Sequence, residues 1–307
     1  MKTPSADGQL TRGAEIMLAI VGGILVANAY YIHPIISAVA ADFGVSPAMI
    51  GLVPALNQGA LALGIFLLLP LGDRYSNRCL AIIFAIGQTA SLLIMVFAPN
   101  YLVFVSGSTI LGFFTIAPYL LPAYASKRVP VERLGSVTAT LTAGTIFGIL
   151  MARVGAGAIT RYFDWHWVYI VAAVLMIGTT IVLPFIMEGR KARAQNADRS
   201  SYAALVMSLF ALMKAHPNVF MSGIIQALNF GIFLAIWLGL ALYLPSPKMG
   251  YGVDIVGYLA GFAIIALFVT PRLGIWADKV GAETVRFRLS VIQMIGVFLL
   301  LPLGHSL

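Results

Sequence analysis

Cysteine is almost absent from this sequence, which contains Cys79 as its single thiol among 307 residues. One cysteine excludes a framework of internal disulfides, and the four histidines form no Cys/His cluster with the spacing of a structural zinc site. The sequence also lacks H-E-x-x-H, G-x-S-x-G and P-loop patterns, so it supplies no catalytic metal site, nucleophile elbow or nucleotide site. We therefore expect no enzymatic activity and no cofactor.

Charge is scarce as well: charged residues make up 10% of the sequence, hydrophobic residues make up 60%, and the mean hydropathy is +0.96. Soluble domains carry about 25% charged residues. Apolar runs of about twenty residues, long enough for an α-helix to cross about 30 Å of hydrocarbon, recur along the chain. The alternating ten-residue segments of an outer-membrane barrel are missing. The sequence therefore predicts an all-α integral membrane protein in a lipid bilayer.

Breaks rich in charge, proline or glycine divide the chain into nine predicted spans. These cover residues 16–40, 48–71, 79–98, 101–125, 134–160, 167–187, 217–244, 255–273 and 288–304. The longest polar stretch separates the first six spans from the last three. We expect an N-terminal six-helix bundle over residues 1–187, a cytoplasmic linker over 188–216 that contains a surface helix at 202–213, and a partial C-terminal bundle over 217–307.

The basic residues gather on one side of this arrangement. With the N-terminus inside, all but three of the 19 basic residues lie at the inner ends of the spans. The exceptions are Arg161 and Lys248 in outer loops and Arg153 inside a span. Lysine and arginine are retained on the cytoplasmic side during insertion. This bias predicts a cytoplasmic N-terminus, and it explains the net charge of +8 without a nucleic-acid partner.

One short charged pattern occurs twice, each time after a long apolar run, at residues 71–78 and 274–281. Repetition at corresponding points of two hydrophobic halves is typical of transporter folds. A carboxylate at a cytoplasmic helix end can bind the N-terminus of a neighbouring helix and nearby basic groups, so we expect a conformational latch. The alternative is charge that only sets topology in a short turn. The predicted latch residues are Asp73, Arg74, Arg78, Gly274, Asp278, Lys279 and Gly281.

Together these motifs resemble the bacterial drug- and sugar-efflux branch of the major facilitator superfamily. Residues 28–34 read NAYYIHP, similar to the N-x-Y-Y-x-Q-P opening of that branch, with His33 in place of glutamine. Asp73, Arg74 and Arg78 match charged positions of the superfamily's G-x-x-x-D-R-x-G-R-R loop, and the second copy keeps its acidic and basic pair. The arginine that the family often places in its fourth helix is Ser108 here, and the proline of the fifth-helix antiporter motif is missing.

The resemblance implies a secondary transporter of the bacterial inner membrane that exports a small organic or amphipathic molecule by alternating access. It also implies a small-molecule substrate and protons as a candidate coupling ion. The family's fold has twelve helices, whereas about nine, six plus three, are predicted here. This shortfall leaves open a truncated chain that is inactive alone. The alternative from another class is a non-transporting membrane scaffold or sensor that binds a partner through its helices.

Polar residues inside the spans are the candidates for a substrate cavity. Arg153 lies eight residues before Arg161, about 12 Å below the outer interface at about 1.5 Å per residue. A cation at the helix centre costs about 2.5–3.5 kcal/mol, so Arg153 is expected to face the cavity or to snorkel. Structural hydrogen bonding between helices is the alternative reading for the whole set. The cavity candidates are Asn28, Tyr31, Asn57, Gln58, Tyr119, Arg153, Gln226 and Asn229.

Two further expectations concern residues inside the spans. No acidic residue lies within a predicted span, so His33 is the candidate for proton coupling, with a structural hydrogen bond as the alternative. Gly144, Gly148 and Ala152 are spaced by four residues, a pattern that predicts close packing against another helix rather than a binding site.

Overall fold

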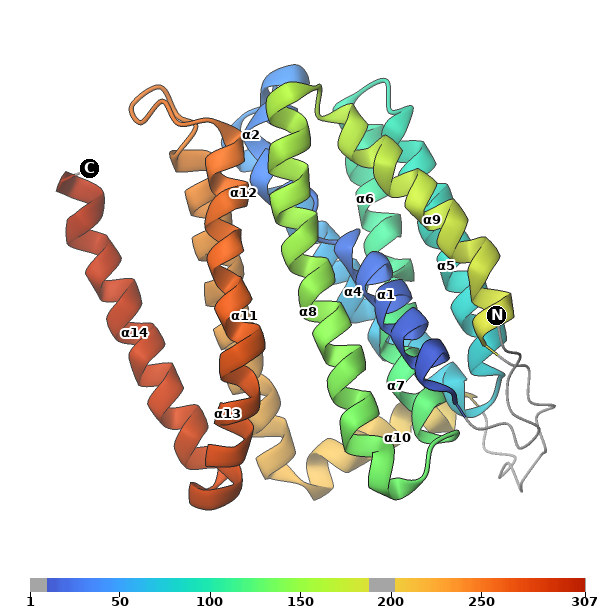
Figure 1. The fold of residues 1–307 in the computed structure, drawn as a ribbon. Helices are drawn as coiled ribbons and strands as arrows, with labels where there is room; N and C mark the ends of the chain where they lie inside the picture. The colour runs from blue at the N-terminus through green and yellow to red at the C-terminus, as the bar shows by residue number, and fades with distance from the viewer. Residues whose placement is uncertain (1–9, 188–201, 307) are drawn as a thin grey trace.

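The computed structural model describes residues 10–187 and 202–306, which form helices joined by short turns (Figure 1). In chain order the elements are α1 (Arg12–Ala27), α2 (Ile32–Asp42), α3 (Pro47–Ile50), α4 (Leu52–Leu68), the short helix η1 (Leu69–Asp73), α5 (Asn77–Val96), α6 (Tyr101–Phe114), α7 (Ala117–Ser126), α8 (Val131–Tyr162), α9 (His166–Ile186), α10 (Tyr202–Ala215), α11 (Pro217–Tyr243), α12 (Val253–Gly261), η2 (Phe262–Ile264), α13 (Ile265–Val280) and α14 (Ala282–Ser306).

In the described residues, seven helical segments are long and apolar enough to cross a membrane: Arg12–Asp42, Pro47–Gly72, Asn77–Val96, Tyr101–Ser126, Val131–Tyr162, His166–Ile186 and Pro217–Tyr243. Their ends agree with the first seven predicted spans to within four residues. The last two predicted spans correspond to α12–α13 and to α14, which are helical but are not among the seven. The all-helical membrane architecture is therefore confirmed, and the predicted surface helix is present as α10.

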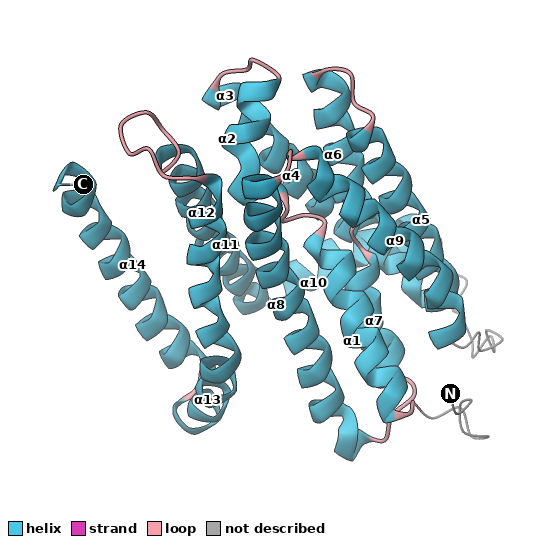
Figure 2. Ribbon diagram, turned by 45° about the horizontal axis from the view of Figure 1, so that its top comes forward, coloured by secondary structure: helices cyan, strands magenta, loops and turns pink. Residues whose placement is uncertain are grey.

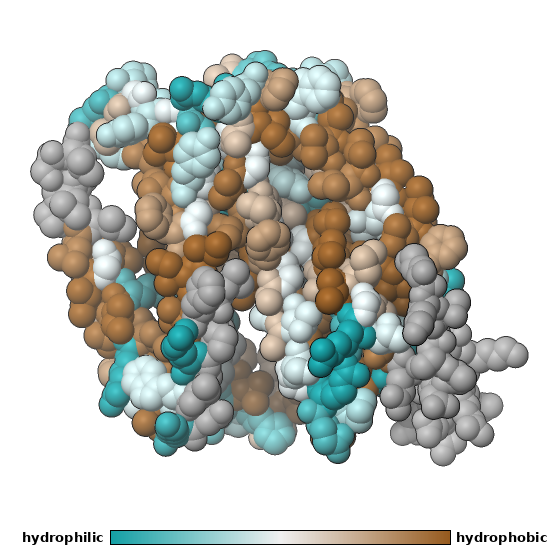
Figure 3. Space-filling view, viewed as in Figure 1, coloured by the Kyte–Doolittle hydropathy of each residue, from teal (hydrophilic) through white to brown (hydrophobic). Residues whose placement is uncertain are grey.

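On the face seen in Figure 3, hydrophobic side chains cover the middle, whereas hydrophilic ones gather along the upper rim and the lower end. The turns that precede α8 and α14 lie at the lower end, together with α10 (Figure 1). This is the end at which the sequence places the basic residues, so we call it the predicted inner end and the opposite end the predicted outer end. The banding is what a chain surrounded by hydrocarbon requires.

Two of the spans are broken near their middle, which the sequence analysis did not anticipate. The first span divides into α1 and α2 at residues 28–31, just before Pro34. The fourth divides into α6 and α7 at Thr115 and Ile116, just before Pro118. Proline has no backbone N–H and its ring clashes with the carbonyl four residues earlier, so it interrupts the helical hydrogen bonds at these points.

Gln88 of α5 ties the two breaks together. Its Nε2 donates to the carbonyl oxygen of Phe114 at 3.2 Å, and its Oε1 accepts from Asn28 Nδ2 at 2.7 Å. Phe114 lies four residues before Pro118, so its carbonyl has lost the N–H partner of a regular helix. Gln88 has no exposed surface, and it therefore supplies hydrogen bonds in a place that water does not reach.

Replacing Gln88 with leucine is expected to lower the free energy of unfolding by about 1–3 kcal/mol, because both inter-helix bonds are lost and each is worth about 0.6–1.7 kcal/mol in a membrane. Gln226→Leu, at an exposed position on α11, is the matched control. Unfolding in mixed micelles with increasing denaturing detergent measures both variants. Equal stability of the two would contradict the role of Gln88.

The predicted glycine packing is confirmed between α1 and α8. A Cβ on Gly144 would lie 2.3 Å from the carbonyl oxygen of Ala19, and one on Gly148 would lie 2.2 Å from that of Gly23. Real Cβ atoms do not approach backbone this closely, so these two helices are in direct backbone contact. This contact fixes α8 beside the first span.

We call the helices α1–α9 the first group and the helices α11–α14 the second group. The two groups meet where helices of the second pack against α2 and α8 of the first. α11 and α12 pack against α2, the part of the first span that follows the break, and α12 also packs along α8. α1 packs instead against α7, α8 and α9, and α13 packs against α14. Figures 1 and 2 show α14 on one flank, then α11 and α12, then α8, with α5 and α9 on the other flank. The two groups of helices therefore join toward the predicted outer end.

Candidate functional site

Arg153 of α8 lies where the two groups of helices meet. Its guanidinium carbon is 4.5 Å from the ring centre of Trp237, 4.9 Å from that of Phe233 and 5.2 Å from that of Tyr30. Its Nη2 is 3.2 Å from Nδ1 of His33. Because arginine has donors and no acceptor, the imidazole nitrogen accepts this bond. We call these five residues the Arg153 cluster; they come from α8, α11, α2 and the turn between α1 and α2.

The charge of Arg153 is not balanced by a carboxylate in the described part of the chain. Its side chain forms none of the described ion pairs, and the residue is 2% exposed. Its Nε is buried without a hydrogen-bond partner. Each ring beneath the guanidinium contributes about 0.5–2 kcal/mol of cation–π attraction. The aromatic faces thus offset part of the cost of burying the cation, and one of its donors stays unused.

Several of the other cavity candidates form hydrogen bonds between helices. Asn57 Nδ2 donates to the carbonyl oxygen of Ser108 at 2.7 Å and so joins α4 to α6. Asn229 Nδ2 lies 3.4 Å from Oγ of Ser290 and joins α11 to α14. With the bond from Asn28 to Gln88, three of the predicted candidates therefore form inter-helix hydrogen bonds, as the alternative reading proposed.

The remaining candidates do not converge on Arg153. Gln58 is partly buried, with no partner for its Nε2, whereas Tyr119 and Gln226 are exposed. Tyr31 is buried at the edge of an apolar groove of about 550 Å³ between α1, α8 and α9. The sequence analysis did not select Phe233, Trp237 or Tyr30 as cavity candidates. The sequence does not show which neighbour an aromatic residue in an apolar helix contacts.

The predicted outer ends of α8 and α12 are in tight contact. Arg161 Nη1 is 3.1 Å from Oδ1 of Asp254. One to two turns along, a Cβ on Gly257 would lie 2.8 Å from the carbonyl oxygen of Arg153 and 3.2 Å from Cα of Gly157. We call Gly157, Arg161, Asp254 and Gly257 the α8–α12 contact. The sequence analysis placed Arg161 in an outer loop, but nothing in the sequence reveals that Asp254, 93 residues further along, is its neighbour.

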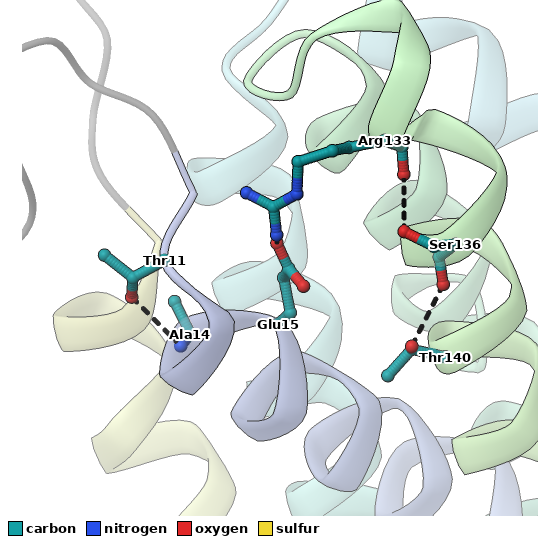
Figure 4. Close-up of polar contacts among 6 residues, drawn as sticks. All are labelled: Thr11, Ala14, Glu15, Arg133, Ser136 and Thr140. Atoms are coloured by element: carbon teal, nitrogen blue, oxygen red, sulfur yellow. Dashed lines mark hydrogen bonds and ion pairs between the residues drawn. The ribbon is translucent and has the colours of Figure 1, made fainter.

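An ion pair joins α1 to α8 at the predicted inner end (Figure 4). Arg133, in the first turn of α8, binds Glu15, which is 7% exposed in the first turn of α1. The same end of α1 is capped by Thr11, whose side-chain oxygen accepts from the backbone N–H of Ala14 at 3.3 Å. A carboxylate in a first helical turn is favoured by the helix dipole. This pair lies within the first group of helices and holds α1 against α8.

The predicted latch falls partly outside the described residues, since the side chains of Asp73 and Asp278, and Gly274, are not among them. Arg74 and Lys279 are exposed, and Arg78 is partly exposed in the first turn of α5. Gly281 ends α13 with a φ of +89°, a backbone conformation that glycine adopts without strain. The latch therefore stays a prediction.

Metal ligands do not cluster in the part of the chain that the structure describes, where no three His, Cys, Asp or Glu side chains come together. The Arg153 cluster is the place where a buried cation, an imidazole and aromatic rings from both groups of helices come together. Chemically, this arrangement combines hydrogen-bond donors with apolar rings at the junction of two groups of helices.

Comparison with known proteins relates the chain to transporters. A family model described as Major Facilitator Superfamily matches residues 18–307. The chain is 27% identical to the uncharacterized transporter YgaY of Escherichia coli O157:H7 over 271 residues, which cover 88% of this chain and 68% of the relative. It is 26% identical to the multidrug resistance protein MdtG of Klebsiella pneumoniae, over 76% of this chain and 56% of the relative.

A solved structure has the same fold. The crystal structure of a bacterial homologue of the human lysosomal transporter Spinster superposes with a TM-score of 0.69 at 14% identity, over 88% of this chain and 63% of that one. The chain thus spans about two thirds of the length of YgaY and somewhat less of this homologue.

Proposed function

Because the chain belongs to the Major Facilitator Superfamily, we propose that it forms the substrate path of a secondary transporter that exports a small organic molecule by alternating access. The superfamily consists of transporters and not of enzymes, in line with the missing catalytic motifs. The single observation that carries the proposal is the convergence of the Arg153 cluster from α2, α8 and α11 at the junction of the two groups of helices. Transporter sites lie near the membrane midplane at such junctions.

The contacts between the two groups support a state that is closed at the predicted outer end. The α8–α12 contact combines an ion pair with direct backbone approach, whereas the segment that follows, α13, packs on α14. Alternating access would require this contact to open while the inner end closes. The predicted latch at the two repeated motifs would act at that inner end.

The direction of transport and the location of the chain are also part of the proposal. The name of the Klebsiella relative, a multidrug resistance protein, supports export, and the bacterial relatives support a bacterial inner membrane. The basic residues at the predicted inner end support a cytoplasmic N-terminus.

Flux through the purified chain in proteoliposomes tests the proposal. We expect saturable, protein-dependent movement of at least one of benzoate, benzamide and ethidium, with empty liposomes as the control. Flux that stays linear in concentration and equal to that of empty liposomes would contradict transport by this chain. Cross-linking to a second polypeptide together with absent flux would favour the scaffold alternative.

His33 can be tested in the same assay. His33→Gln keeps a side-chain acceptor for Arg153 but cannot be protonated at neutral pH. If His33 couples transport to protons, we expect the variant to lose flux driven by a pH gradient. Unchanged pH-driven flux would assign His33 to a structural role.

A further inference from the structure

We propose that the Arg153 cluster binds the carboxylate of a small organic monoanion whose apolar body lies against Phe233 and Trp237. The inference deepens the proposed function, since it names the substrate class of the same site. It does not need transport for its test, because binding is measurable in the purified chain.

The first argument is the uncompensated charge. Arg153 is a buried cation, and the carboxylates of the described ion pairs are bound to other residues. Its depth along α8, eight residues from Arg161, places it about 12 Å below the outer interface, too deep for a lipid headgroup. A charge at this depth usually pairs with a partner in the cavity, and here that partner has to arrive from outside the described chain.

The second argument is the unused hydrogen-bonding capacity. A guanidinium has five N–H donors in a planar fork that matches the two oxygens of a carboxylate. One donor group of Arg153 reaches His33, and Nε has no partner. A bidentate carboxylate would satisfy the open side of the fork with charge-assisted bonds. His33 accepts a bond from Nη2 and so leaves Nε as a buried donor without a partner, which a carboxylate that enters the cluster would satisfy.

The third argument concerns the body of the ligand. Phe230, Phe233 and Trp237 lie along one face of α11, with successive ring centres 6.0 Å and 6.3 Å apart. Phe233 is 36% exposed and Trp237 is partly exposed, and both rings also contact the guanidinium of Arg153. An aromatic ring or a short alkyl chain can pack there by offset or edge contacts.

The single positive charge of the cluster selects the charge of the ligand. Among the described contacts, Arg153 is the one cation of the cluster, with neutral rings and an accepting imidazole around it. Sites for phosphate and other dianions use several cations or a helix N-terminus. A monocarboxylate therefore fits the cluster better than a phosphorylated compound.

Fluorescence titration of the purified chain tests the inference, because Trp237 stands beside the guanidinium. Benzoate and benzamide are the probes, since they share a ring and differ in charge. We expect saturable quenching by benzoate, binding of benzamide at least tenfold weaker, and little effect of chloride. Loss of the signal in Trp237→Phe assigns it to this site. No saturable response to benzoate, or equal responses to benzoate and benzamide or to benzoate and chloride, would overturn the proposal.

Variants locate the binding. Arg153→Gln is expected to weaken benzoate binding at least tenfold. The affinity of Arg153→Lys is expected to lie between those of the parent chain and Arg153→Gln, because lysine keeps the charge but not the planar fork of donors. Lys248→Gln, which removes an exposed cation from the α11–α12 loop, is the matched control and should bind as the parent does. Unchanged binding by Arg153→Gln would overturn the proposal. If that variant does not fold, the comparison of benzoate with benzamide on the parent chain decides alone.

The two proposals fail separately. Selective benzoate binding without any flux would contradict transport by this chain and keep the anion site. Saturable flux of ethidium or benzamide without benzoate binding would contradict the anion site and keep transport.

Discussion

Gly148→Ala is expected to lower the free energy of unfolding by about 3 kcal/mol, the upper end of the cost of overpacking a tightly packed interior. The new Cβ would stand 2.2 Å from the carbonyl oxygen of Gly23 and 2.5 Å from its Cα. Both atoms are backbone, so no change of side-chain rotamer relieves the clash, and α1 has to move away from α8. Unfolding in mixed micelles with increasing denaturing detergent measures the loss.

Gly155→Ala is the matched control on the same helix, because a Cβ there meets nothing within 4 Å. Elsewhere in a helix, glycine to alanine gains about 0.5–1 kcal/mol in propensity, so the control is expected to be neutral or slightly stabilising. The two variants should therefore move in opposite directions. Equal effects would mean that α1 and α8 do not approach as closely as the structure has them.

Gly257→Leu is expected to open the α8–α12 contact without unfolding either group of helices. Its Cβ would lie 2.8 Å from the carbonyl oxygen of Arg153, so the closed arrangement becomes overpacked by about 1–3 kcal/mol. If the protein exchanges between two states, each 1.4 kcal/mol shifts their ratio tenfold. The ratio of closed to open molecules should therefore fall by about fivefold to 150-fold.

Spin labels on cysteines at positions 163 and 248, in a Cys79→Ser background, measure this shift. Phe163 and Lys248 are both exposed, and they lie at the predicted outer ends of the two groups of helices. The distance distribution is expected to move to longer values in Gly257→Leu. Gly261→Leu, four residues further along where a Cβ meets nothing within 4 Å, should leave it unchanged. An identical distribution in both variants would contradict a movable outer contact.

The sequence was sufficient to locate the first seven spans, because hydrocarbon imposes a minimum apolar length and the chain marks the ends with charge and proline. It was not sufficient to place the breaks inside the first and fourth spans. Pro34 and Pro118 are visible there, but proline is tolerated in membrane helices when a neighbour supplies hydrogen bonds. Here that neighbour is Gln88, 60 residues from Asn28 and 26 residues from Phe114.

The sequence also predicted part of the candidate site and not the rest. Arg153 and His33 stood out because a cation and an imidazole are rare inside apolar spans, and the structure places them together. The aromatic residues of α11 were not predicted, because the sequence does not distinguish an aromatic residue that contacts a cation from one that contacts lipid. Asn57 was predicted as a cavity candidate. An amide inside a span indicates either a cavity or a hydrogen bond between helices, and Asn57 donates to the carbonyl oxygen of Ser108.

Side-specific labelling of one cysteine determines whether the two groups of helices close at the outer end over a site that opens to the other side. The position is Phe233→Cys in the Cys79→Ser chain, reconstituted in vesicles of known orientation and treated with a membrane-impermeant maleimide. We expect fast labelling from the inner side and slow labelling from the outer side, with outer labelling accelerated by Gly257→Leu. Equal labelling from both sides that Gly257→Leu does not alter would contradict it.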